Sequence, residues 1–324
     1  MEIVPQGALT PLLRWLTIRG MKRTRRPTET SSFGTGRREG HDAEPFYRRF
    51  RTPEISKDET IQACSVEDEI VCGDARDMSR VNDNSVALLV TSPPYFAGKE
   101  YEQAMGEGHI PGSYIEYLAM LRDVLAEGRR VLEPGGRMAI NVANLGRKPY
   151  RSLSSDVTRI LQDELGLLLR GEILWVKAEG ASGSCAWGSF QSASNPVLRD
   201  ISERVIVACK GRFDRAISRK KRQERSLPFE NSVTRDGFME STLDVWRIPP
   251  ESARKIGHPA PFPPALVERL IHLYSYRGDT ILDPFMGSGT TAVAALSTGR
   301  RYVGFDSEQE YVNLANSRID SVRL

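Results

Sequence analysis

Residues 280–291 read TILDPFMGSGTT, and this stretch decides the fold. The apolar residues 280–282 predict a short strand, and residues 290–296 predict a helix. Between them, glycines at 287 and 289 let the backbone come close to a ligand because no Cβ stands in the way. The amides at the helix start add a positive end that suits a carboxylate. We therefore expect a strand–turn–helix unit that binds a small ligand.

The glycine turn alone leaves its ligand open between a phosphate, NAD and S-adenosylmethionine, and a tight turn without any ligand is a further alternative. Thr290 stands where a phosphate-binding loop carries a lysine, which argues against that loop. A dinucleotide fingerprint would place its third glycine at position 292, where Ala is tolerated. Asp306 follows Gly287 by 19 residues and ends the next predicted strand. An acid at that distance suits the two hydroxyls of a ribose.

The same alternation of strand and helix extends over most of the chain. Apolar runs and helical periodicity predict the following elements: strands at 69–74, 86–90, 137–142, 172–177, 203–210, 280–282 and 302–305, and helices at 114–132, 154–165, 263–276, 290–296 and 310–322. We expect Pro134 to Gly136 to end the first helix, and Ser154 or Ser155 to cap the second. The fold class is therefore α/β, with a doubly wound, mostly parallel, Rossmann-like sheet.

A second motif, Thr91-Ser92-Pro93-Pro94-Tyr95, ends the predicted strand 86–90. A proline pair cannot continue a ladder, so the motif could be no more than a strand stop. Its position is nevertheless the one where open α/β sheets bind ligands.

The chemistry of this corner suits an amino group on a nucleobase. The lone pair of such a group is delocalised into the ring, and acceptors aimed at its hydrogens favour a tetrahedral nitrogen that can attack. The hydroxyl of Ser92 and the carbonyl of Pro93 can accept those hydrogens, and Tyr95 offers a flat face for a base taken out of the duplex.

Composition narrows the class of protein. The chain has 324 residues, 40% of them hydrophobic and 27% charged, with a net charge of +3. Its four cysteines show no CxxC spacing, so we expect neither a disulfide framework nor a metal site, and a reducing cytoplasm fits. No apolar run approaches the ~20 residues that a membrane span needs.

Three regions depart from the α/β pattern. Residues 1–60 are net basic and rich in Ser, Thr and Gly, which predicts a flexible arm. Residues 178–202 are small and polar, and residues 210–250 begin with a strongly basic run. This run could be a solvated helix face, but it could also follow DNA phosphates. Its candidate phosphate contacts are Arg212, Arg215, Arg219, Lys220, Lys221 and Arg222. At helical spacing, Arg215, Arg219 and Arg222 share one face.

Taken together and in this order, the motifs resemble the permuted beta group of amino-methyltransferases from bacterial restriction–modification systems. In that group a Ser/Asp/Asn-Pro-Pro-aromatic motif precedes the target-recognition region, and the cofactor motif comes last. Further matches are the segments 174–177 (LWVK), 244–246 (DVW), 258–263 (HPAPFP) and 299–304 (GRRYVG). The resemblance covers about residues 69–320 and implies a methyltransferase domain at 69–324, with 178–202 and 210–250 as its target-recognition insertion.

The resemblance also implies site residues and a cofactor, S-adenosylmethionine. Ser92, Pro93, Pro94 and Tyr95 would hold the target base. The cofactor residues it implies are Asp74 at the adenine amino group, His258, Pro261 and Phe262 over the methionine end, Asp283 near the cofactor amino group, Phe285, Gly287 and Gly289 around the pocket, Thr290 at the helix start and Asp306 at the ribose.

The implied activity is site-specific methylation of double-stranded DNA, with a separate cognate endonuclease as a possible partner and a monomer or dimer as the assembly. The leading Ser resembles cytosine-N4 enzymes more than adenine-N6 enzymes, although a hydroxyl and a carboxylate both accept hydrogen bonds. No Pro-Cys pair is present, which argues against a covalent cytosine-C5 mechanism. A methyltransferase of RNA or protein, a non-catalytic DNA-binding module and an NAD dehydrogenase are the alternatives.

Overall fold

The computed structural model describes residues 55–94, 113–144, 150–177, 188–198, 200–251 and 262–323, all within one compact unit, Pro53–Leu324. Of the predicted flexible arm, residues 1–54 lie outside the described residues. Residues 55–60 are described, and they contact the basic segment: the Ser56 amide donates to the Gly211 carbonyl at 2.6 Å, and Glu59 pairs with Lys221 at 3.6 Å.

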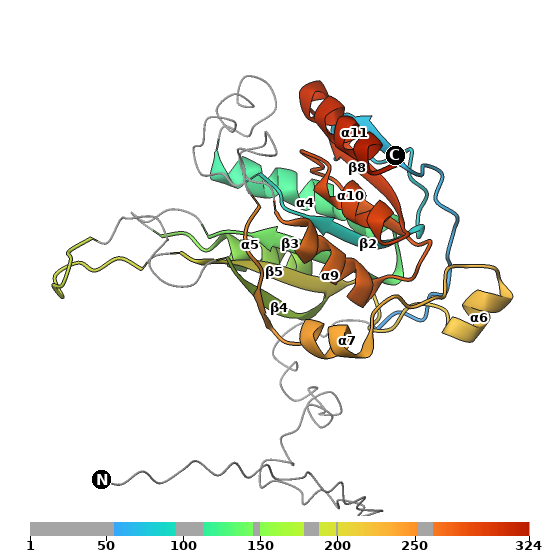
Figure 1. The fold of residues 1–324 in the computed structure, drawn as a ribbon, viewed down its shortest axis with the longest axis horizontal. Coiled ribbons are helices and arrows are strands. Elements are labelled where there is room, and N and C mark those ends of the chain that lie inside the picture. The colour runs from blue at the N-terminus through green and yellow to red at the C-terminus, as the bar shows by residue number, and fades with distance from the viewer. Residues whose placement is uncertain are drawn as a thin grey trace, which may run out of the picture. The chain divides into compact units, whose positions relative to one another are not determined.

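An eight-stranded sheet forms the centre of this unit (Figure 1). In spatial order its strands are β1 (Glu69–Cys72), β8 (Arg301–Asp306), β7 (Thr280–Asp283), β2 (Val86–Thr91), β3 (Leu132–Val142), β5 (Ser202–Cys209), β4 (Leu168–Val176) and β6 (Val245–Arg247). Every neighbouring pair is parallel except the two that include β5. The predicted mostly parallel α/β sheet is confirmed.

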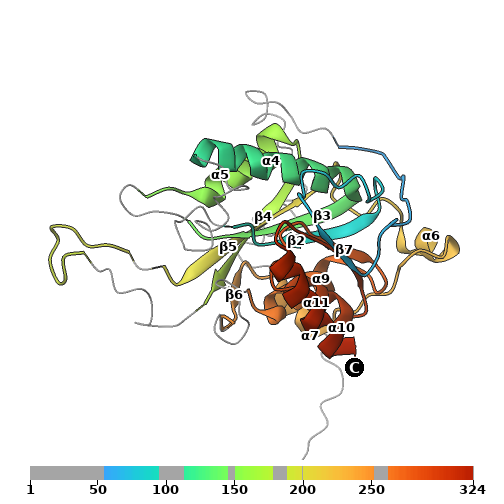
Figure 2. The same ribbon diagram turned by 90° about the horizontal axis from the view of Figure 1, so that it is seen from above.

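Helices cover both faces of the sheet (Figure 2). On one face lie α4 (Tyr114–Val131), α5 (Leu153–Arg159) and η2 (Ile160–Glu164), and on the other lie α9 (Pro264–Tyr274), α10 (Thr290–Ser297) and α11 (Gln309–Arg323). Strand β2 is buried along its whole length, with Leu89 in one apolar cluster and Leu88 and Val90 in the other. A strand covered on both faces needs such a continuous apolar run. Within the described residues, no helix is both long and apolar enough to cross a membrane.

Several predicted boundaries need correction. Strand β3 begins at Leu132 and not after the Pro134–Gly136 stop, because a register shift between Val86 and Leu88 on β2 accommodates the extra residues. Ser152, and not Ser154 or Ser155, caps α5 by accepting from the Ser155 amide. The predicted second helix changes to π geometry at Ile160. Two short helices, α6 (Arg219–Glu224) and α7 (Arg235–Ser241), lie in the insertion and were not predicted, because six or seven residues are too few to show periodicity.

A buried cluster of ion pairs connects the basic segment to the amino-terminal edge of the sheet. Arg222 lies 2.5 Å from Glu133, and Arg215 lies 3.0 Å from Asp279 and also pairs with Glu133. The side chains of Arg222 and Arg215 are 1% and 10% exposed. Despite burial, the two guanidinium groups keep the pKa of Glu133 below its usual value.

The predicted phosphate contacts at Arg215 and Arg222 are therefore wrong. The predicted common helix face does not form, because α6 begins only at Arg219, which is exposed, and Arg215 precedes it. Glu133 and Asp279 instead pair with the buried side chains of Arg215 and Arg222. Glu133 lies near the start of β3, and Asp279 immediately precedes β7. The basic segment thus lies at the edge opposite to the corner that follows β2.

Replacement of one cation in this cluster should destabilise the fold. In Arg222→Met the charge of Glu133 loses a buried partner, and we expect a loss of roughly 3 kcal/mol of unfolding free energy. The matched variant Lys220→Met removes an exposed charge of the same helix and should stay within about 0.5 kcal/mol of wild type. Urea unfolding measures both, and equal stabilities would show that the cluster contributes nothing.

Candidate active site

The two sequence motifs meet where adjacent strands end. Strands β2 and β7 are parallel neighbours with Leu88 opposite Ile281 and Leu89 opposite Leu282. The Ser92–Pro93 corner after β2 and the glycine turn after β7 therefore leave the sheet side by side at its carboxyl edge. About 190 residues separate the motifs in the sequence, and a hydrogen bond joins them: Thr91 Oγ1 donates to Asp283 Oδ1 at 2.6 Å, across 192 positions.

Asp283 is the centre of this junction. Its other oxygen accepts from Thr291 Oγ1 at 2.6 Å, and Oδ1 also accepts from the Phe285 amide at 3.0 Å. The residue is wholly buried. The expected contact between Asp283 and the cofactor amino group is corrected accordingly: the carboxylate faces inward and joins the strand before the corner to the first turn of α10.

Burial raises the pKa of Asp283 to about 6, although its three hydrogen bonds favour the ionised form. A carboxylate without solvent is costly unless such donors surround it. The buried charge of Asp283 therefore needs the hydroxyls of Thr91 and Thr291. These two hydrogen bonds fix the distance between the two motifs.

The glycine turn has the geometry that its sequence predicts. Gly287 and Gly289 adopt left-handed φ angles of 50° and 80°. Gly289 is the N-cap of α10 and supplies no side-chain cap. A Cβ on Gly289 would lie 2.8 Å from the Cβ of Ala315, so helix α11 packs too closely for any other residue. The uncapped amides at the start of α10 suit a carboxylate.

Asp306, at the end of β8, faces this turn. Its Oδ2 accepts from the Gly287 amide at 2.8 Å, and Oδ1 accepts from the Glu308 amide at 3.0 Å. Burial raises its pKa. A carboxylate has about four lone-pair sites, and each oxygen here uses one for an amide. Asp306 can therefore still accept hydrogen bonds from two ribose hydroxyls, so its chemistry fits a nucleoside ligand.

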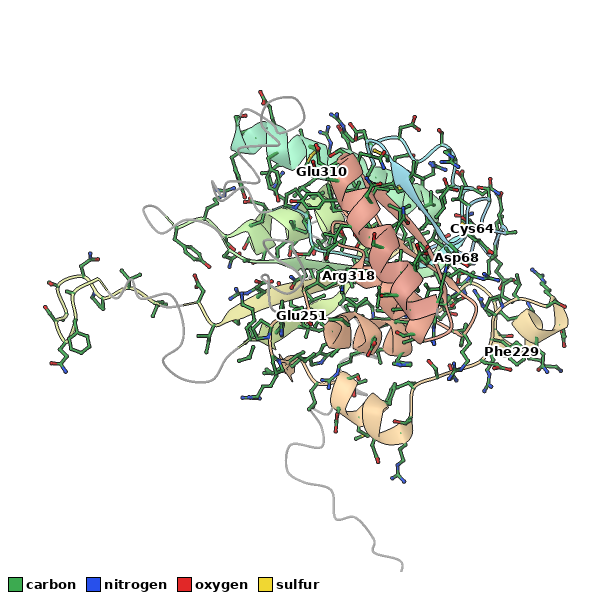
Figure 3. The ribbon with its side chains drawn as sticks, turned by 45° about the horizontal axis from the view of Figure 1, so that its top comes forward. Cys64, Asp68, Phe229, Glu251, Glu310 and Arg318 are labelled. Carbon is green, nitrogen blue, oxygen red and sulfur yellow. The ribbon has the colours of Figure 1, made fainter. Side chains whose placement is uncertain are left out.

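Arg318 on α11 was not predicted from the sequence (Figure 3). Its Nη1 donates to the carbonyl of Ser288 at 2.5 Å and to the Ser288 hydroxyl at 2.9 Å, and it lies 3.3 Å from Thr290 Oγ1. Arg318 thus stabilises the glycine turn from helix α11. An arginine 28 residues downstream of Thr290 in an amphipathic helix gives no sequence signal for this contact.

Helix α4 holds the corner formed by Ser92, Pro93 and Pro94. Pro93 is buried, and Ser92 and Pro94 are half-buried. The Tyr117 hydroxyl donates to the Pro94 carbonyl at 2.6 Å. This contact fixes the backbone of the second proline. The sequence did not predict the contribution of Tyr117 to the site. Tyr95 lies outside the described residues.

The remaining predicted cofactor residues differ in their surroundings. Asp74 follows β1, and the neighbouring strands place Cys72 opposite Asp306 at the same edge. The carboxylate of Asp74 forms an exposed ion pair with Arg76 at 2.5 Å. Phe262 is 9% exposed and belongs to the apolar cluster under α9 and α10. Phe285 is half-buried beside the glycine turn, and His258 and Pro261 lie outside the described residues.

The other predicted DNA contacts lie at the amino-terminal edge. Arg219, Lys220 and Lys221 are exposed on α6, whereas Arg212 pairs with Asp214 at 3.1 Å. By contrast, the connection from β4 to β5 leaves the carboxyl edge. Within it, Gly188 pairs with Pro196, and Phe190 is 63% exposed. In Figures 1 and 2 this segment and α6 lie at opposite ends of the sheet.

The raised pKa of Asp283 predicts a difference in the pH dependence of stability. The folded protein binds a proton at Asp283 near pH 6, whereas the unfolded chain binds it near pH 4. The ionised carboxylate thus costs stability above pH 6, and this cost disappears as the pH falls. Relative to Asp283→Asn, which does not titrate, wild type should gain about 1 kcal/mol of unfolding free energy between pH 7 and 5. Urea unfolding of both proteins at the two pH values measures this gain, and parallel pH profiles would contradict it.

Known proteins match this chain in sequence and in fold. A family model described as a DNA methylase matches residues 86–317. The type II methyltransferase M.BglI of Bacillus subtilis is 27% identical over 306 residues, which cover 77% of this chain and 84% of M.BglI. M.MjaI of Methanocaldococcus jannaschii is 28% identical over 284 residues, covering 78% of this chain and 90% of M.MjaI.

Solved structures share the fold. TTHA0409 of Thermus thermophilus, solved in complex with S-adenosyl-L-methionine, aligns with a TM-score of 0.60 and 28% identity over 78% of this chain and 93% of its own. The PvuII DNA methyltransferase, described as cytosine-N4-specific, aligns with a TM-score of 0.58 over 83% of this chain and 94% of its own. Its 16% identity supports a likeness of fold alone. Because the family model matches most of its length, the chain belongs to the N6/N4 DNA methylase family.

Proposed function

We propose that this protein methylates the exocyclic N4 amino group of a cytosine flipped out of double-stranded DNA, at one sequence site, as part of a restriction–modification system. The observation that carries the proposal is the junction of the two motifs through Thr91 and Asp283. It places an acceptor-lined corner beside a turn suited to a nucleoside with a carboxylate. Neither motif alone would distinguish methyl transfer from simple binding.

The methyl donor is S-adenosylmethionine, which when bound supplies an electrophilic methyl group on a positively charged sulfur. Asp306 would accept the ribose hydroxyls, and the uncapped amides at the start of α10, directly after Gly289, would receive the methionine carboxylate. We assign Asp74 to the adenine end, and His258, Pro261 and Phe262 to the closure over the methionine end.

The residues of the corner would activate the amine. Ser92 Oγ and the carbonyl of Pro93 accept its hydrogens, so that the nitrogen lone pair leaves the ring plane and points toward the methyl carbon. One N–C bond forms, one S–C bond breaks, and the amine then releases one proton to water. Tyr95 would stack on the base. Such positioning needs no strong base beside the amine, because the positive charge that develops on nitrogen makes its proton acidic.

The choice of cytosine rests on the leading Ser of the motif. A hydroxyl presents one modest acceptor to the amine, and this residue is the one that resembles N4 enzymes. The duplex would lie along the carboxyl edge, near the connection from β4 to β5. Arg219, Lys220 and Lys221 would then meet only phosphates that reach the opposite edge.

Expression in a methylation-free host, followed by sequencing that distinguishes N4-methylcytosine from N6-methyladenine, tests the activity and the base together. We expect N4-methylcytosine at one sequence context. N6-methyladenine instead would overturn the assignment of the base, and methyl groups in RNA or protein without any in DNA would overturn the proposed substrate.

Removal of the Ser92 hydroxyl tests its role. We expect Ser92→Ala to lower the single-turnover rate by about 100-fold while cofactor affinity remains near wild type. Ser92→Thr, which keeps an acceptor, is the matched control. A rate near wild type in Ser92→Ala would show that the hydroxyl takes no part.

A further inference from the structure

A buried carboxylate lies next to the catalytic corner, on the side away from the glycine turn. Glu203 is the second residue of β5 and is 7% exposed. Its Oε1 accepts from Lys177 Nζ at 2.6 Å, and its Oε2 accepts from Asn141 Nδ2 at 2.6 Å. The sheet brings these side chains together, because β5 lies between β3, which carries Asn141, and β4, which Lys177 follows.

Asn141 connects this pair to the corner. Its Nδ2 lies 3.4 Å from Ser92 Oγ as well as 2.6 Å from Glu203. The contact with Ser92 is long for a hydrogen bond, as contacts at a catalytic centre often are before the substrate binds. Asn141 is 3% exposed, so little room remains for other orientations of its amide.

The carboxylate decides which way that amide points. An ionised Glu203 can only accept hydrogen bonds, so the NH₂ group of Asn141 must face it. The same NH₂ group then faces Ser92, which accepts through Oγ. Lys177 in turn donates to the other oxygen of the carboxylate and balances its charge. A buried ion pair is weak evidence for a gain in stability, so its connection to Ser92 is what distinguishes this pair.

Resting on the proposed function, we propose that Lys177, Glu203 and Asn141 are positioning residues for Ser92. The amide of Asn141 holds the serine oxygen in one rotamer, with its acceptor side toward the substrate amine. Glu203 acts through Asn141, and Lys177 acts through Glu203. None of the three needs to touch the base, the cofactor or the methyl group.

The variant Glu203→Gln tests this arrangement with little change in shape. A glutamine amide can donate to the carbonyl oxygen of Asn141, which allows the asparagine to turn and present that oxygen to Ser92. We expect the single-turnover rate of methyl transfer to fall 10- to 100-fold, while the dissociation constants for S-adenosylmethionine and for DNA stay within twofold. Glu172→Gln is the matched control. This carboxylate of β4 is 50% exposed, and its distance of 4.0 Å from Arg204 makes the ion pair weak. Its rate should equal that of wild type.

Combined variants separate positioning from a general structural effect. In an Asn141→Ala background, Glu203→Gln should cause no further loss of rate, because the route to Ser92 through Asn141 is already broken. In a Ser92→Ala background the same change should also have no effect on the residual rate. Full, multiplicative losses in both backgrounds would overturn the proposal, as would a wild-type rate in Glu203→Gln alone. If wild type itself transferred no methyl group to DNA, the proposed function would fail instead.

Discussion

The hydrogen bond from Thr91 to Asp283 is the constraint on which the site depends. It joins a strand that leads to the acceptor corner with a strand that leads to the glycine turn. Because the carboxylate is wholly buried, it needs both threonine hydroxyls, and it therefore cannot release one motif without a large cost. The sheet provides the approximate placement through the pairing of β2 with β7, and this junction fixes the remaining distance.

The carboxyl edge and the amino-terminal edge of the sheet carry different kinds of residues. The carboxyl edge carries Asp306, the glycine turn and Ser92, to which we assign the ligand contacts. At the amino-terminal edge, Glu133 and Asp279 neutralise the inward arginines of the basic segment. Some basic side chains of this segment are therefore buried, and others are exposed to solvent. The structure, and not the sequence, shows which of them are accessible to DNA.

Most of the fold could be predicted because long apolar strands and periodic helices depend on local sequence. The strand β2 and the helices α4 and α11 match their predicted ranges within one or two residues. Contacts set by strand register could not be predicted: Thr91 with Asp283, Tyr117 with Pro94, and Asn141 with Glu203 join residues far apart in the chain. Arg215 and Arg222 were misassigned because a charge run does not show which face is covered. The roles of Tyr95, His258 and Pro261 stay predictions.

The single-turnover rate of Thr91→Val, compared with Thr91→Ser, tests most directly whether the two motifs work as one site. Valine keeps the shape of threonine but leaves Asp283 without one donor, whereas serine keeps the hydroxyl. At saturating S-adenosylmethionine, methyl transfer to DNA should fall at least tenfold in Thr91→Val and recover most of the loss in Thr91→Ser. Equal rates in wild type and Thr91→Val, with both proteins folded, would contradict the account, because the corner would then keep its position without the bond to Asp283.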